Sequence, residues 1–238
     1  MNLLGVVTFG EPRPGFIQLA DILAPYPNRS YRNNPEGVFG HDLVTDVPAH
    51  APPEFPYVHG GECGVNPRHL IDIDGPPTDP LDLTPFRWHH TYLYLAGMLN
   101  LDPLPVTLLS GATEGVTDLD CLNLCGALYG DPAFAPVAWD HLDEGADDGI
   151  HWAAKRVGGI WVVCNRGTKN LQDTFRDIRG YSTTDPKLGP LEAGFAEGAP
   201  RQAAEVLTLI GGDPVLFTGH SLGGARAQIQ AGYAVTGP

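Results

Sequence analysis

The sequence is short of positive charge. Its 238 residues include 14 Lys and Arg against 28 Asp and Glu, which gives a formal net charge of −14 at pH 7. Nucleic acids and anionic membrane surfaces would repel such a chain, so we expect neither as a partner. Neutral small molecules and neutral lipids are the better-matched class of partner.

Long apolar runs are also missing. No segment approaches the roughly eighteen consecutive apolar residues that a membrane helix needs. Residues 1–9 show no basic start and no cleavage-like stretch, so they predict no secretory leader. The compartment stays open between the cytoplasm and secretion by a route that the sequence does not show. The chain is 42% hydrophobic, which is enough for one core, and we expect residues 1–238 to form a single domain.

Cysteine is scarce as well. The four cysteines, at positions 63, 121, 125 and 164, form neither a disulfide framework nor a paired C-x-x-C zinc pattern. Cys121, Cys125 and Leu128 share one helical face, so we predict buried thiols rather than metal ligands. The acidic run at residues 140–148 fits no calcium-loop spacing and is predicted to be a solvated loop. We therefore predict no metal and no cofactor.

The most informative motif is GHSLG at residues 219–223, which directly follows the apolar run at 215–217. A G-x-S-x-G pattern between a strand and a helix is typical of a nucleophile elbow, where the serine sits on a sharp turn with no room for neighbouring side chains. Residues 225–233 are rich in Ala and Gln and lack proline, as expected of the following helix. A glycine-rich turn that happens to contain serine is the alternative.

Periodicity predicts an α/β protein. The β-prone runs are residues 5–9, 160–164 and 215–218, and apolar residues spaced i, i+3, i+4, i+7 predict helices at 16–23 and 203–210. Strands that alternate with helices favour a mainly parallel sheet with helices on both faces.

Three motifs in the second half of the chain belong together. Residues 161–168 (WVVCNRGT) form a strand-like run that ends in R-G-T, residues 192–195 (EAGF) precede a helical stretch, and residues 219–225 (GHSLGGA) contain the serine motif. In this order, residues 119–238 resemble the N-terminal half of the class 3 (fungal-type) lipases, a family of the α/β-hydrolase superfamily.

The start of the chain resembles the other half of that family. Residues 7–15 (VTFGEPRPG) are similar to its T-F-G-x-P-R-x-G strand and turn, residues 42–48 (DLVTDVP) to its acid loop, residues 55–59 (FPYVH) to its histidine loop and residues 90–92 (HTY) to its closing helix. Residues 1–97 therefore resemble the C-terminal half. The resemblance implies an α/β-hydrolase fold in circularly permuted order. A swapped dimer, in which the first block completes a neighbour's sheet, stays open as a second arrangement.

Chemistry and resemblance together suggest a catalytic triad. A serine hydroxyl needs a base to accept its proton, so Ser221 as nucleophile requires a histidine, and His59 in the histidine loop is our candidate. Asp42 is the candidate acid that orients the imidazole, because it opens the D-x-V-x-x-V-P run where the family carries its acid. Asp46 is the rival on the same loop.

The remaining histidines near these motifs are expected to have other roles. His220 should point away from the serine at an elbow, and His89 and His90 are expected to be structural. For the oxyanion, the backbone N–H of Leu222 is one predicted donor, and the resemblance implies that Thr168 gives the other.

The resemblance also implies a lid over residues 169–189. Leu171, Phe175 and Ile178 fall on one helical face, which fits a short amphipathic lid helix in transient contact with lipid or, equally, a helix packed on the core. Thr174 and the pair at 191–192 depart from the family pattern.

Together these features predict a serine carboxylic-ester hydrolase that cleaves acylglycerols or other neutral esters through an acyl-enzyme. The alternatives are a phospholipase or a short-chain or aromatic esterase with the same triad, and a binding module that kept the fold without catalysis.

Overall fold

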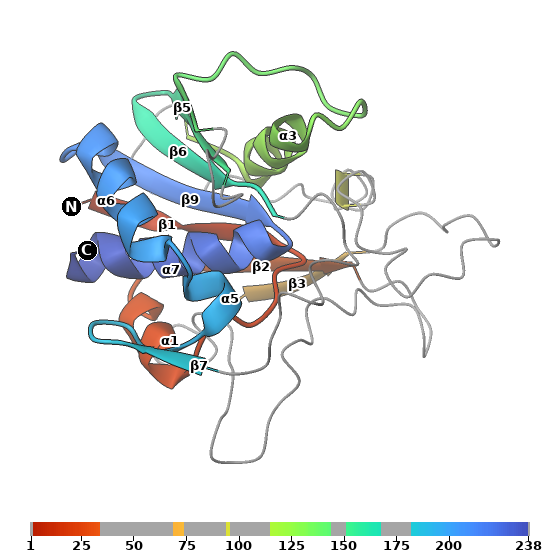
Figure 1. Cartoon of the computed structure of the whole chain (residues 1–238). Helices are drawn as coiled ribbons and strands as arrows, with labels where there is room; N and C mark the ends of the chain where they lie inside the picture. The colour runs from red at the N-terminus through yellow and green to blue at the C-terminus, as the bar shows by residue number, and fades with distance from the viewer. Residues whose placement is uncertain are drawn as a thin grey trace.

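The structure is a computed structural model that describes residues 2–33, 69–73, 94–95, 115–143, 151–167 and 182–237. Strands and helices are interspersed along the described chain (Figure 1). The strands are β1 (Asn2–Phe9), β2 (Asn28–Asn33), β3 (His69–Ile73), β4 (His141–Asp143), β5 (Trp152–Val157), β6 (Ile160–Asn165), β7 (Ser182–Asp185), β8 (Gly189–Glu192) and β9 (Pro214–His220). The helices are α1 (Ile17–Leu23), α3 (Asp118–Tyr129), α5 (Ala193–Ala196), α6 (Ala199–Ile210) and α7 (Leu222–Thr236).

Seven of these strands form one sheet in the order β3-β2-β1-β9-β6-β5-β4. The five strands from β3 to β6 in this order are parallel, whereas β5 runs antiparallel to β6 and β4 antiparallel to β5. The protein is therefore of the α/β class with a mostly parallel sheet, as the sequence predicts. Strands β7 and β8 form a separate hairpin.

Helices cover both faces of the sheet. Because alternate side chains of a strand point to opposite faces, Val6 and Phe217 join one core cluster with α1, α5, α6 and α7. Val7 and Leu216 join a second cluster on the other face with α3. Both β1 and β9 are buried along almost their whole length, and each carries an apolar run, which is why their sequences predict them well.

Local signals fix the ends of α3. Thr117 and Asp120 form a reciprocal capping box, in which the Asp120 N–H donates to Thr117 Oγ1 at 3.1 Å and the Thr117 N–H donates to Asp120 Oδ2 at 2.9 Å. The helix ends at Gly130, whose φ of 69° suits a left-handed cap. The predicted face of Cys121, Cys125 and Leu128 is buried, and the prediction of buried thiols is confirmed for the described cysteines.

The strand β1 lies at the centre of the sheet, although it is early in the chain. Val6 pairs with Asn28 on β2 and with Phe217 on β9. The start of β1 and the end of α7 lie on the same side of the molecule (Figure 1). The two ends of the sequence thus contribute neighbouring strands to a single sheet within one chain.

A buried polar network lies between β1, β2 and α7. The Ser30 hydroxyl donates to Glu11 Oε1 at 2.5 Å, Gln228 Nε2 donates to the same oxygen at 3.2 Å, and Thr8 Oγ1 lies 2.8 Å from Ser30 Oγ. Burying a carboxylate is tolerated when it accepts hydrogen bonds. This network explains why β2, a strand of polar sequence, lies in the interior.

Two segments differ in the structure from what the sequence predicts. The acidic run that begins at Asp140 is partly strand, since His141–Asp143 forms β4, so the loop prediction is wrong for these residues. Asp140 itself is exposed, and its carboxylate lies 3.3 Å from Lys155 Nζ. The end of the predicted lid, from residue 182, forms the hairpin of β7 and β8, while Leu171, Phe175 and Ile178 lie outside the described residues.

Candidate active site

Ser221 sits at a strained turn between β9 and α7. Its φ of 59° and ψ of −137° make it the only non-glycine residue with positive φ in the described part of the chain. Such a conformation costs about 1–3 kcal/mol and persists only where the surroundings enforce it. Here the Ser221 N–H donates to the carbonyl of Phe9 at 2.9 Å, and the Gly224 N–H donates to the carbonyl of Ser221 at 2.9 Å.

The glycines of the motif are required by close packing. A Cβ on Gly219 would lie 2.3 Å from the carbonyl carbon of Gly223, and a Cβ on Gly223 would lie 2.1 Å from the carbonyl oxygen of Asn165. Side chains essentially never approach backbone so closely. The predicted strand–turn–helix geometry of an elbow is therefore confirmed, while the role of Ser221 as nucleophile stays a prediction.

The Ser221 side chain is buried, and its hydroxyl makes no hydrogen bond among the described residues. The residue is 1% exposed. Buried hydroxyls normally have a partner, so such an atom in a strained turn makes Ser221 a candidate functional residue. Leu222, the first residue of α7, follows directly, and the N–H groups of a helix's first turn lack partners within the helix. The predicted donor of Leu222 is thus at the correct end of a helix, with its positive dipole toward the serine.

Tyr129, which sequence reasoning missed, joins the elbow to the loop after β6. Its hydroxyl donates to the carbonyl of His220 at 3.2 Å and accepts a hydrogen bond from the N–H of Gly167. A tyrosine phenol is protonated at neutral pH, and burial raises the pKa of Tyr129 further, so the hydroxyl remains a donor. Tyr129 is the last residue of α3, and nothing in the sequence around it marks this role.

Gly167 lies where the oxyanion loop is predicted. A Cβ there would lie 2.4 Å from Tyr129 Oη and 3.0 Å from Ser221 Cβ, so only glycine lets the loop approach the serine. The described part of this loop therefore lies against the elbow. Thr168, the predicted second donor, is the next residue and lies outside the described residues.

His220 is held by aromatic side chains. Its ring centroid lies 5.5 Å from that of Tyr129 and 5.6 Å from that of Tyr94, both edge-to-face, and its Nδ1 lies 3.4 Å from Tyr129 Oη. The His220 imidazole thus contacts two tyrosine rings, and the expectation that it points away from the serine stays a prediction.

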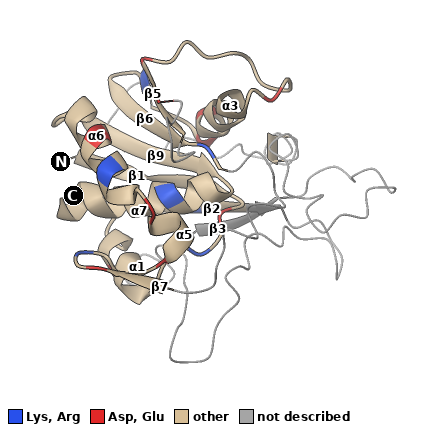
Figure 2. Ribbon diagram, viewed as in Figure 1, with Lys and Arg blue, Asp and Glu red and all other residues tan. Residues whose placement is uncertain are grey.

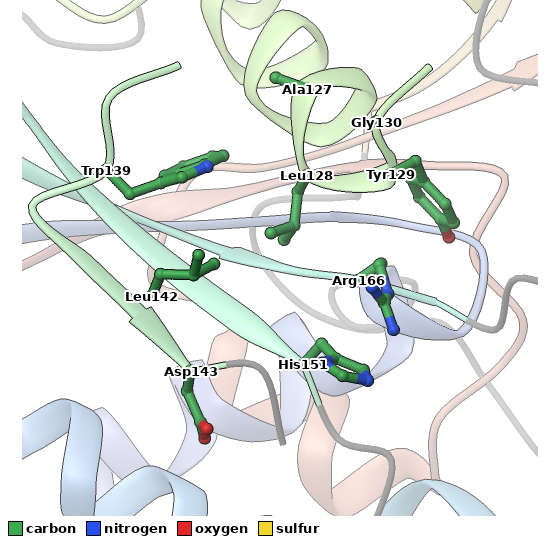
Figure 3. A pocket seen from close by; sticks show the side chains of 9 residues that line it. All are labelled: Ala127, Leu128, Tyr129, Gly130, Trp139, Leu142, Asp143, His151 and Arg166. Carbon is green, nitrogen blue, oxygen red and sulfur yellow. The ribbon is translucent and has the colours of Figure 1, made fainter. Parts of the chain in front are cut away.

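A cavity of about 500 Å³ opens beside this constellation. Tyr129 and Arg166, which flank Gly167, belong to its wall (Figure 3). The opposite wall is formed by Trp139 and Leu142. Ligand sites in α/β sheets lie at the carboxyl ends of parallel strands, and both Arg166 and Ser221 follow such ends, on β6 and β9.

Comparison with family models, curated proteins and solved structures finds no match. The assignment of a function therefore depends on the geometry of the site.

The predicted base and acid, His59 and Asp42, lie outside the described residues, as does the rival acid Asp46. Their roles stay predictions. In sequence, both acids follow the carboxyl end of β2. This end of β2 lies two strands from β9, at the same edge of the sheet as Ser221.

The position of Tyr94 makes His90 a second candidate for the base. It is fully buried, and its ring contacts His220 beside Ser221 and lies 6.3 Å from that of Phe9. His90 is four residues earlier in the sequence, so at most about 14 Å of extended chain separates it from this position. Moreover, His90 follows the carboxyl end of β3, whereas His59 precedes the amino end of that strand. The topology thus favours weighing His90, expected from sequence to be structural, alongside His59.

The described residues do not suggest a metal site. No group of three or more His, Cys, Asp or Glu within them is placed to hold a metal ion. The thiols of Cys125 and Cys164 lie 3.5 Å apart in the core, and burial raises the pKa of Cys164 and of Cys121, which makes them poor ligands and poor nucleophiles. Among the described helices, none has the length and apolarity to cross a bilayer.

Proposed function

We propose that this protein is a serine carboxylic-ester hydrolase of the α/β-hydrolase type, acting on acylglycerols or other neutral esters. The observation that carries the proposal is the buried Ser221 in a strained turn between a central parallel strand and a helix, with its Oγ unpartnered among the described residues. Strain at such a position is maintained by function, since a relaxed turn would be more stable.

The proposed reaction proceeds through an acyl-enzyme. Ser221 Oγ attacks the ester carbonyl while a histidine accepts its proton, and the Leu222 N–H with a donor of the loop at Gly167 holds the negative oxygen of the tetrahedral intermediate. Collapse of the intermediate expels the alcohol, which takes the proton from the histidine. Water, deprotonated by the same histidine, then attacks the acyl-enzyme, releases the acid and restores Ser221.

The chain order of the site is proposed to be circularly permuted. In support, β1 pairs with β9 at the centre of the sheet, and α7 packs against β1. A catalytic triad is defined by convergence in space and not by chain order, so the permutation leaves the chemistry unchanged.

The serine assignment can be tested by labelling. A fluorophosphonate should add its mass to Ser221 only, and Ser221→Ala should lower kcat for a p-nitrophenyl ester at least a thousandfold, because no other group supplies the attacking oxygen. Ser182→Ala, a change on the β7 hairpin, should retain both labelling and activity. Hydrolysis undiminished in Ser221→Ala would contradict the proposal, and a folded wild type that neither reacts with the probe nor hydrolyses esters would favour a binding module.

The base can be identified with a pair of variants, His59→Ala and His90→Ala. Removal of the true base should lower kcat about a thousandfold or more, while loss of the other imidazole should change it less than tenfold. If both variants kept full activity, the triad mechanism would be wrong.

A further inference from the structure

The cavity beside the elbow combines an apolar wall with three polar side chains. Leu128, Trp139 and Leu142 form the apolar part, and Asp143, His151 and Arg166 the polar part (Figure 3). Leu142 is 46% exposed, so the cavity has a hydrophobic side chain that is accessible to solvent. An amphipathic ligand matches this lining better than a purely apolar acyl chain does.

The register of the sheet places these polar residues in a row with the elbow. Asp143 pairs with Trp152, Trp152 with Asn165, and Asn165 with Gly219. Neighbouring strands are about 4.8 Å apart, so Arg166 lies about one strand, His151 two strands and Asp143 three strands from the serine turn, a span of roughly 5, 10 and 14 Å. A group bound here would be within one small molecule's length of Ser221.

Arg166 and His151 form the end of the cavity nearer the serine. The backbone N–H of Arg166 donates to the carbonyl of His151 at 2.9 Å, and the Arg166 guanidinium points toward the His151 ring (Figure 3). Arginine carries a permanent charge and several donors, and imidazole offers an N–H in either protonation state. A phosphate group is the anion that this fork of donors suits best.

The far end of the cavity has the opposite character. The Asp143 carboxylate points away from Arg166, and the indole of Trp139 lies on the same side of the cavity, with Leu142 between the two (Figure 3). A carboxylate and an indole face can each attract a quaternary ammonium group. The two ends therefore match the two charges of a zwitterion.

We propose that this cavity binds the phosphocholine-type headgroup of an acyl ester, so that the substrate class of the site is a zwitterionic phospholipid or lysophospholipid. The inference on substrate rests on the proposed hydrolase function. A glycerol backbone carries its ester and its phosphate a few bonds apart, which matches the one or two strands between Ser221 and the Arg166–His151 pair. A headgroup of zero net charge also avoids the repulsion that the charge of −14 exerts on anionic lipids.

Headgroup binding can be measured without turnover. In the Ser221→Ala protein, glycero-3-phosphocholine should bind by calorimetry, whereas glycerol should not. Adding Arg166→Gln should weaken binding at least tenfold, and adding His151→Gln, which spares the loop next to Gly167, should weaken it severalfold. Arg201→Gln, on the outer face of α6, should leave the affinity unchanged. Absence of binding, or equal affinity in all variants, would overturn the proposal.

Selectivity gives an independent readout in the active enzyme. The ratio of kcat/KM for a 1-acyl-glycero-3-phosphocholine to that for the 1-monoacylglycerol of the same chain should fall at least tenfold in Arg166→Gln and severalfold in His151→Gln. A purely structural defect would lower both values together and leave the ratio unchanged, which would overturn the headgroup site. Because headgroup binding is measured in the Ser221→Ala protein, it can succeed where the proposed hydrolysis fails, so the two failures are distinguishable.

Discussion

At the scale of single residues, the elbow is held by backbone contacts that leave no room for side chains. The carbonyl of Phe9 fixes the Ser221 N–H, and Gly219 and Gly223 let α7 lie directly on the ends of β9 and β6. The strain of one residue is thus distributed over three strands. This geometry was predictable because glycines two residues before and after a serine indicate a sharp turn with no room for side chains.

Gly223→Ala should be strongly destabilising. Its Cβ would lie 2.1 Å from the Asn165 carbonyl oxygen, so β6 or α7 must move, and we expect the free energy of unfolding to fall by about 3 kcal/mol or more. Gly212→Ala is the matched control, because nothing lies within 4 Å of the place its Cβ would take, and it should change stability by less than about 1 kcal/mol. Urea denaturation followed by circular dichroism measures both; similar stabilities would contradict the packing described.

Other residues of the site were not predictable. Tyr129 bridges Gly167 and His220 through contacts between residues far apart in sequence, and no local pattern encodes such a bridge. The triad partners His59 and Asp42 rest on the lipase resemblance and stay predictions.

At the scale of elements, a buried ionic contact ties α3 to β2. Arg29 Nη2 donates to Asp118 Oδ1 at 2.6 Å, and the Tyr31 hydroxyl donates to the other carboxylate oxygen. Burial raises the pKa of Asp118, although Arg29 and Tyr31 partly offset the effect. Polar contacts therefore hold the first residue of α3, Asp118, against β2.

Arg29→Met should destabilise the protein in a pH-dependent manner. It leaves a buried carboxylate without its cation, which costs about 3 kcal/mol at pH 7 and raises the pKa of Asp118 further. A carboxyl group whose pKa is higher in the folded than in the unfolded state contributes stability at low pH that is lost as the pH rises through that interval. The loss caused by Arg29→Met should therefore be smaller at pH 5 than at pH 7, as measured by urea denaturation at both values.

The exposed pair of Arg156 and Asp213 provides the control. These side chains are 48% and 44% exposed, so Arg156→Met should change the free energy of unfolding by less than about 1 kcal/mol and equally at both pH values. An Arg29→Met effect as small as this would show that the contact of Asp118 is not energetically important.

The elements that the sequence predicts are those that carry an apolar pattern. The strands β1, β6 and β9 and the helices α1, α6 and α7 carry apolar runs or helical spacing, and all were predicted. Strand β2 was missed because its buried side chains are polar and are satisfied by Glu11 and Asp118, partners that only the fold supplies. Strand β5 was missed because Lys155 and Arg156 break its apolar run.

At the scale of the whole molecule, the α/β class was predictable from the alternation of strands and helices, whereas the strand order was not, because register and neighbours depend on contacts across the chain. The lipase resemblance anticipates that β1 follows α7 in a conventional order, and that remains part of the proposal.

Joining the ends tests the permutation. A short Gly/Ser linker from the end of α7 to the start of β1, with a new opening at residues 100–114, between the two blocks that resemble the halves of the lipase family, should give a protein with unchanged circular dichroism and ester hydrolysis, since the joined elements lie on the same side of the molecule. The Lys, Arg, Asp and Glu residues of the described elements are scattered along the ribbon (Figure 2). An unfolded product would contradict the permuted order.

The central position of β1 also constrains how the protein is made. During translation β1 leaves the ribosome long before β9, yet Val6 and Phe217 are neighbours in the finished sheet. Although β2 can pair with one edge of β1 early, the other edge of this largely apolar strand stays without its partner until β9 has been synthesised, and such exposed segments are prone to aggregate. Production in cells should therefore depend on chaperones that shield β1 until β9 emerges.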